Sequence, residues 1–180
     1  KAVEEIIVVD NGSTDGTRSA VKANFPFVKY IFEENKGVSL ARNVGIDRSS
    51  HEWIAFLDSD DEWSERKIEI FRDYYGKSKN REKIWHSNEI WIRNGRHLNQ
   101  KICHKKKGGY IFEECVRMCC ISPSSAIIHK NIFNRFGLFD ESLDVCEDYD
   151  FWLRVSSKEM IGFINEKLVT KYGGHGDQLS

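Results

Sequence analysis

The sequence has 180 residues, which is enough for one domain with a hydrophobic core. A formal net charge of -1 excludes the strongly basic surface of a typical nucleic-acid-binding protein. Hydrophobic residues make up 40% of the chain, which suits a soluble globular protein, and no apolar run approaches the length of a membrane span. The five cysteines show no metal-ligand spacing, so we expect free thiols in a reducing cytosol.

The first predicted strand, Glu5 to Val9, lies almost at the start of the chain, which begins with Lys1. We therefore expect that residues of the native N-terminus are missing. The strand is short and rich in β-branched residues, as buried strands are. It ends on Asp10, and a glycine-containing turn with Ser13 follows. Asp10 either accepts hydrogen bonds from a nucleobase or ribose, or only builds the turn with Ser13, and the residues alone leave the two interpretations equal.

Strand and helix alternate along the next segment. A strand is predicted over Val28 to Phe32, and Asn35-Lys36-Gly37 opens a helix over Val38 to Asp47 that carries Arg42 and Asn43. Such alternation favours an α/β fold with a mainly parallel sheet and helices on both faces.

The next predicted strand, Trp53 to Leu57, ends on three carboxylates within four positions: Asp58, Asp60 and Asp61. A helix is predicted to follow from Ser64 to Tyr75. Ligands of open α/β sheets bind at this edge of the sheet, where three like charges need a counter-charge. A hard cation such as Mg2+ or Mn2+, held by one or two carboxylates and by substrate phosphates, would supply it. The alternative is a turn with solvated carboxylates.

The second half of the chain, from about residue 82, changes in character. A strand with loose alternation is predicted over Lys83 to Ile92, and Arg93-Asn94-Gly95-Arg96 indicates a hairpin with a type I′ turn. The basic run in Lys101 to Gly109 is interpreted as a solvated loop, and a phosphate or membrane-surface contact is the less favoured alternative. A helix is predicted over Tyr110 to Cys119 and a strand over Ala126 to His129.

Two acidic residues, Glu147 and Asp148, stand at a predicted helix start, with Phe151 and Trp152 on the apolar face of that helix. These acids either favour the helix dipole, or one of them is a carboxylate held near apolar surface as a general base. His175 in the glycine-rich tail is either a ligand for a metal or phosphate, or an exposed histidine.

Four segments, in this order, resemble the family 2 glycosyltransferases, which have the glycosyltransferase-A fold: Val9 to Ser13, Asn35 to Asn43, Phe56 to Asp61 and Glu147 to Arg154. The likeness runs from about Ile6 to about Arg154, and the opening strand of the family is absent. The resemblance implies a single catalytic domain over residues 1–180. Its nucleotide-binding half would span about residues 1–75, and its acceptor-binding half, with a small mixed region, about residues 82–180.

The resemblance also implies the chemistry: transfer of a sugar, with inversion, from a nucleotide-diphosphate donor, commonly a UDP-sugar, to an acceptor hydroxyl. Asp148 would be the general base, with Glu147 as the neighbour that orients it. The residues implied to contact the donor are Asp10, Asn11, Ser13, Lys36, Arg42 and Asp58. The ligands implied for Mg2+ or Mn2+ are Asp58, Asp60 and His175.

At the level of the family, the expected acceptor is a saccharide or lipid-linked saccharide, and no nucleic acid is expected as a partner. The expected location is the cytoplasm, with a peripheral position at the inner face of the cytoplasmic membrane. One alternative is a sugar nucleotidyltransferase, although its glycine-rich basic loop is not visible. Another is a carbohydrate- or cation-binding module that uses Asp58 to Asp61. It would not be an EF-hand, because the glycine and closing glutamate are misplaced.

Overall fold

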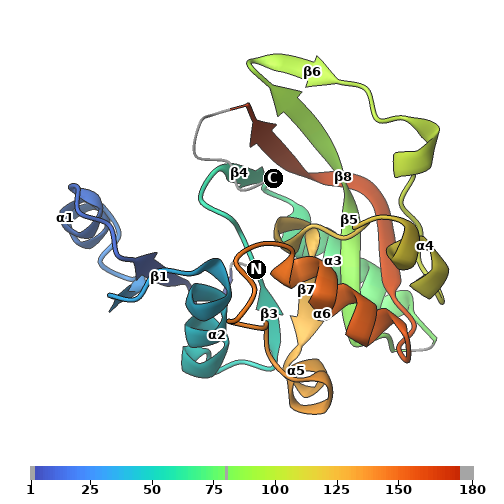
Figure 1. Ribbon diagram of the computed structural model, residues 1–180, viewed down its shortest axis with the longest axis horizontal. Helices are drawn as coiled ribbons and strands as arrows, with labels where there is room; N and C mark the ends of the chain where they lie inside the picture. The colour runs from blue at the N-terminus through green and yellow to red at the C-terminus, as the bar shows by residue number, and fades with distance from the viewer. Residues whose placement is uncertain (1–2, 80, 175–180) are drawn as a thin grey trace.

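The computed structural model describes residues 3–79 and 81–174 (Figure 1). In its first part, strands and helices alternate as the sequence predicts, but the helix expected from Ser64 begins three residues later. The elements of this part are β1 (Ile7–Asn11), α1 (Thr17–Asn24), β2 (Lys29–Glu33), α2 (Val38–Arg48), β3 (Trp53–Ala55), β4 (Asp61–Trp63) and α3 (Lys67–Lys77).

The second part contains the longest strands. Its elements are β5 (Ile84–Arg93), β6 (Arg96–Leu98), α4 (Phe112–Arg117), β7 (Ile127–His129), α5 (Lys130–Phe136), α6 (Glu147–Ser156) and β8 (Gly162–Gly173), with the 3-10 helices η1 (Ile102–His104) and η2 (Pro123–Ser125). The hairpin prediction is confirmed: Asn94 and Gly95 join β5 to β6 with φ of 48° and 72°, as a type I′ turn requires.

The α/β class is confirmed, but the prediction of a mainly parallel sheet is wrong. β1 and β2 form a parallel pair of their own, and the larger sheet has the order β3-β7-β5-β8-β4, with β6 added to β5. In that sheet only β5 and β8 run parallel, and the other pairs are antiparallel. Residue pattern could not show this, because a buried strand has the same composition in either direction.

A strand that the sequence did not reveal explains the late start of α3. Asp61 to Trp63 forms β4 and pairs with Lys171 to Val169 of β8, so the acidic segment is continued by sheet rather than by helix. β3 likewise pairs with β7. Two strands of the expected nucleotide-binding half, β3 and β4, therefore share one sheet with strands of the expected acceptor-binding half, whereas β1 and β2 do not.

The core beneath α6 fixes the direction in which this helix presents its first turn. Phe151 and Trp152 are fully buried, which confirms the predicted apolar face, and the Phe151 ring packs 4.7 Å from that of Phe139.

Figure 1 shows the β1–β2 pair and α1 at one end, the larger sheet at the other and α2 between them. Within residues 3–79 and 81–174, no helix combines the length and apolarity needed to cross a bilayer.

Candidate functional site

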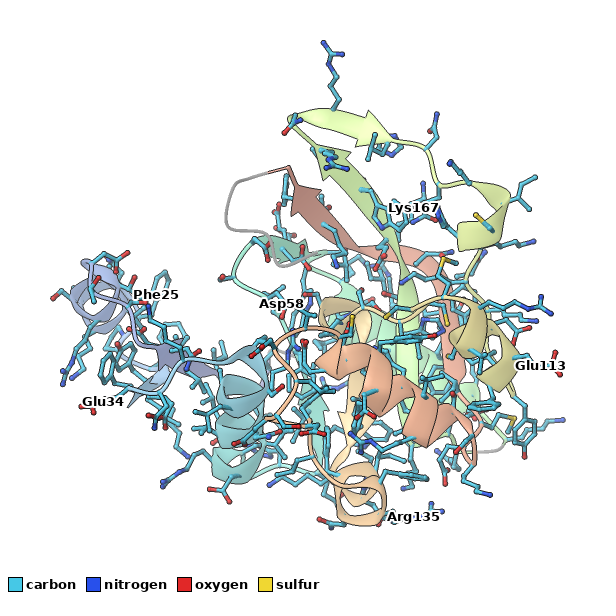
Figure 2. The ribbon with its side chains drawn as sticks, viewed as in Figure 1. Phe25, Glu34, Asp58, Glu113, Arg135 and Lys167 are labelled. Atoms are coloured by element: carbon cyan, nitrogen blue, oxygen red, sulfur yellow. The ribbon has the colours of Figure 1, made fainter. Side chains whose placement is uncertain are left out.

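An open cleft of about 2270 Å³ runs between the two parts of the molecule. Residues from both halves of the sequence line it. Figure 2 shows Asp58 near the middle of the molecule, between the β1–β2 pair and the larger sheet. The predicted site residues that line the cleft are Asn11, Arg42, Asp58, Asp60, Glu147 and Asp148.

Arg42 holds the central position in this cleft. Its Nη2 donates to Oδ1 of Asp58 over 2.9 Å, and its Nη1 donates to Oε1 of Glu147. The side chains of Arg42 and Glu147 are about nine-tenths buried. Burial lowers the pKa of Arg42, but the charges of Asp58 and Glu147 and the hydrogen bonds to them outweigh burial and raise it. The acidic turn and the start of α6 are therefore joined through one buried guanidinium.

Asp148 lies in the first turn of α6, next to Glu147. Its Oδ1 accepts the backbone N–H of Tyr149 over 2.7 Å, and the Cys119 thiol lies 3.7 Å from its Oδ2. Burial raises the pKa of Asp148, and the charge of Glu147 acts in the same direction. A partly buried carboxylate with a raised pKa at the wall of a cleft has the properties of a general base.

Asp10 ends β1 as part of a hydrogen-bonded turn. Its Oδ1 accepts the N–H of Ser13 over 2.9 Å, and its Oδ2 accepts the hydroxyl of Tyr30 on β2. Burial would raise the pKa of Asp10, but these hydrogen bonds outweigh it and lower the pKa. Asp10 is 4% exposed. The turn-building interpretation of Asp10 and Ser13 is therefore observed, whereas nucleotide contact by Asp10 stays a prediction.

Asn11 extends from β1 toward the loop before α2. Its Oδ1 accepts the N–H of Gly37 over 2.7 Å, and its Nδ2 donates to the carbonyl of Asn35 over 2.5 Å. Gly37 has a φ of 147°, which a side chain would disfavour. Asn11 thereby fixes the loop that carries Lys36, whose exposed side chain lies outside the cleft lining.

The acidic turn presents its three carboxylates differently. Asp60 is exposed, Asp58 pairs with Arg42, and both carboxylate oxygens of Asp61 are shielded without a hydrogen bond in the described part of the chain. Burial raises the pKa of Asp61, against the effects of Ser124 and Lys171. No three His, Cys, Asp or Glu side chains among residues 3–79 and 81–174 are grouped to hold a metal by themselves.

Comparison with protein families decides what kind of domain carries this cleft. Residues 2–136 match the model of glycosyl transferase family 2. The chain belongs to glycosyl transferase family 2.

Relatives of this family 2 glycosyltransferase include an uncharacterized glycosyltransferase of Rickettsia conorii, 30% identical over 173 residues, or 91% of the chain and 27% of the relative. Another is TuaG of Bacillus subtilis, named for teichuronic acid biosynthesis, 42% identical over 69 residues, or 36% of the chain and 27% of TuaG. Among the first relatives the chain spans between 24% and 53% of the relative's length.

Solved structures support the fold assignment. S. aureus TarS (residues 1–349), crystallised with UDP, superposes with a TM-score of 0.75 at 21% identity, covering 94% of this chain and 51% of that one. The same protein with UDP-GlcNAc also gives a TM-score of 0.75, covering 96% and 50%. This similarity confirms the expected glycosyltransferase-A fold.

The structure also places a buried polar cluster in the wall of the cleft, which the sequence did not reveal. Oε2 of Glu89 lies 3.0 Å from Nζ of Lys106 and accepts the hydroxyl of Ser122 over 2.6 Å, while its Oε1 accepts the Trp91 indole N–H over 2.7 Å. The side chains of Glu89 and Lys106 are 4% and 5% exposed. Interpretation of the basic run as a solvated loop is therefore wrong for Lys106, because Glu89 neutralises its charge inside the protein.

A second missed group is the η2 turn. The Ser124 hydroxyl accepts the N–H of Asp58 over 3.0 Å, and its carbonyl accepts the indole N–H of Trp63 over 2.8 Å. Ser124 thus holds the acidic turn and the strand that follows it through two hydrogen bonds. The sequence signal was Pro123 among serines, which predicts a turn but not its partner. His175, predicted as a metal ligand, lies outside the described residues.

Proposed function

We propose that this family 2 glycosyltransferase moves a sugar from a nucleotide-diphosphate sugar to an acceptor hydroxyl, with inversion, and that the donor is a UDP-sugar. The observation that carries the proposal is the connection through Arg42, which brings Asp58 of the acidic turn and the Glu147–Asp148 pair into one cleft. The structures of TarS in complex with UDP and with UDP-GlcNAc support a uridine donor.

Asp58 and Asp60 are the residues that would hold Mg2+ or Mn2+ in this site. The donor set fits, because hard cations prefer oxygen ligands, and Mg2+ typically takes one or two carboxylates together with substrate phosphates. The exposed Asp60 side chain is accessible to such a complex. The cation would neutralise charge on the departing diphosphate.

Asp148 acts as the base in this proposal. It takes the proton of the acceptor hydroxyl while the hydroxyl oxygen bonds to C1 of the sugar and the bond from C1 to the diphosphate oxygen breaks. Attack opposite the leaving group inverts the configuration at C1. Glu147, held by Arg42, positions Asp148. Burial raises the pKa of Asp148 and the charge of Glu147 raises it further, which favours proton transfer near neutral pH.

The acceptor in this proposal is a saccharide or lipid-linked saccharide, bound toward Trp91, Glu89 and Lys106 at the far end of the cleft. Polysaccharide assembly at the inner face of the cytoplasmic membrane, with peripheral attachment, is the proposed setting. The name of TuaG is consistent with such a role.

Calorimetric titration of UDP, with and without Mn2+, tests the donor side. We expect Mn2+ to strengthen UDP binding, and Asp60→Asn to remove most of that gain because a neutral amide replaces the anionic carboxylate. Asp47→Asn, an exposed carboxylate near the end of α2, is the matched control and should keep the gain. UDP binding that ignores Mn2+, or an unaltered gain in Asp60→Asn, contradicts the proposed metal role.

A further inference from the structure

Positive charge is concentrated in residues 93–107, which form the end of β5, the hairpin, β6 and the loop through η1. The segment holds six Lys and Arg and no Asp or Glu, whereas the whole chain has 27 against 28. A net charge of -1 for the chain thus leaves -7 for the rest. Segregation of this kind fits an anionic partner.

Most of these cations are not used inside the protein. Lys106 pairs with the buried Glu89, and Lys107 pairs with Glu114 over 2.5 Å. The other four are exposed and form no ion pair within residues 3–79 and 81–174: Arg93, Arg96, Lys101 and Lys105. Their charges face solvent.

The loop that carries η1 is attached to β5 on both sides. Gln100 donates to the carbonyl of Glu89 over 3.2 Å, and the His104 ring lies 5.0 Å from that of Trp91. The ion pair between Lys106 and Glu89 attaches the loop to β5 two residues after His104. The position of the tip of this loop is therefore set by its contacts.

The tip presents apolar groups between the cations. Ile102 is 93% exposed and is flanked by Lys101 and by Lys105, three residues on. Leu98 before this tip in the sequence, and Tyr110 and Phe112 after it, are also exposed apolar side chains. A single exposed isoleucine is common, but one held out by a fixed loop among unpaired cations matches the composition of a membrane-surface contact.

We propose that β6, η1 and the loop leading to α4 form a docking surface for an anionic lipid bilayer. Ile102 enters the headgroup region while Lys101 and Lys105 contact lipid phosphates. Figure 1 shows β6 and α4 along the side of the molecule opposite α1. This surface specifies the peripheral attachment included in the proposed function, and lipid binding can be measured separately from sugar transfer.

The surface is continuous with the acceptor end of the cleft. Arg93, Leu98, His104 and Lys106 belong to the docking segment and also line the cleft. A bilayer on this surface would lie beside the opening where the acceptor enters. An acceptor held in the membrane by a lipid would then reach the site without leaving the bilayer.

The test is co-sedimentation of the protein with phosphatidylcholine vesicles, prepared with and without phosphatidylglycerol, at low and physiological salt. We expect binding to the anionic vesicles alone and weaker binding as salt rises. Ile102→Ser and the double variant Lys101→Gln/Lys105→Gln should each lower partitioning roughly tenfold or more.

A matched control comes from the opposite end of the molecule. Phe27 is 72% exposed and its ring lies 6.3 Å from that of Phe25, which Figure 2 shows far from Glu113 of α4. Phe27→Ser should keep vesicle binding. Circular dichroism establishes that each variant is folded, and UDP titration of the same variants reports on the proposed donor site independently.

Three results would overturn the proposal. The first is equal binding to neutral and anionic vesicles, or none to either. The second is a loss in Phe27→Ser as large as that in Ile102→Ser. The third is a change in sedimentation velocity of Ile102→Ser without vesicles, because it would assign the surface to contacts between protein copies.

Discussion

Nη2 of Arg42 lies 2.9 Å from Oδ1 of Asp58 and connects the middle of α2 to the acidic turn that follows β3. Its other terminal nitrogen holds Glu147, 105 residues further along the chain. Arg42 was predicted to assist at the nucleotide, and the structure gives it a more specific role. It keeps two carboxylates of the cleft at a fixed separation.

Replacement of Arg42 should therefore cost stability as well as activity. In Arg42→Met the buried Glu147 loses its counter-charge, and we expect the free energy of unfolding to fall by about 3 kcal/mol. Arg42→Lys should rescue only part of the loss, because one ammonium cannot reproduce a planar fork. Urea unfolding measures both, and Arg66→Met, which breaks an exposed pair with Glu69, should leave stability nearly unchanged. A comparable loss in Arg66→Met would show that burial is not the cause.

Asp148→Asn should separate catalysis from stability. Turnover is expected to fall roughly a hundredfold or more, with UDP affinity retained, because the base acts in the transition state. Because burial raises the pKa of Asp148, the fold favours the protonated carboxyl over the charged one. The stability that the protonated carboxyl contributes is lost as pH rises through the raised pKa. The neutral amide should therefore unfold at the same or a higher urea concentration at pH 7. A less stable variant with normal turnover would place the base elsewhere.

The hydrogen bond from Tyr30 to Asp10 should make the free energy of unfolding depend on pH. The lowered pKa of Asp10 means that its charged form stabilises the fold at neutral pH, and that this stability is lost as pH falls through the lowered pKa. Tyr30→Phe removes one donor, so the difference in unfolding free energy from wild type should be present at pH 7 and shrink below about pH 4. A difference that does not vary with pH would assign the effect to packing.

The burial of Asp10 determines what its replacement by alanine should do. A residue at the end of a strand can often be replaced without loss of the fold, but the carboxylate of Asp10 is buried and accepts two hydrogen bonds. We now expect Asp10→Ala to lower stability and to raise the dissociation constant for UDP. Titration of UDP at a temperature where the variant is folded separates the two effects. An unaltered dissociation constant would leave turn formation as the only role of Asp10.

The buried Lys67 should make the stability of the fold change with pH in the alkaline range. Burial, assisted by the charge of Lys106, lowers the pKa of Lys67 to about 7, while its Nζ donates to the carbonyl of Ser125 over 3.0 Å. Between about pH 7 and pH 10 the unfolded chain binds more protons at this site, so the contribution of Lys67 to stability rises with pH. Lys67→Met should lack that rise when urea unfolding is compared with wild type across this range. Parallel curves for the two proteins would contradict the lowered pKa.

Local signals in the sequence were sufficient for much of the fold and part of the site. The run of apolar residues before Asp58 predicted a strand, the Asn94-Gly95 pair predicted a hairpin, and the position of Glu147 predicted a helix start. Each of these depends on neighbouring residues, and each is confirmed.

Features that depend on distant partners were not predictable in this way. β4 has two acids among its three residues, and only its pairing with β8 makes it a strand. Lys106 belongs to a basic run, and its burial requires Glu89, 17 positions away. The ion pairs of Arg42 likewise join residues that no local pattern connects. Composition alone could not show which charged side chains are paired inside the protein.

β8 lies beyond residue 136, where the family match ends, yet it is bonded to β5 along most of its length and to β4 next to the acidic turn. The amide protons of Asp61 to Trp63 should accordingly exchange with solvent in step with those of Val169 to Lys171, as one cooperative unit. The order of the acidic turn therefore depends on the last strand of the described chain, and fraying of that strand would also loosen carboxylates that lie more than a hundred residues earlier.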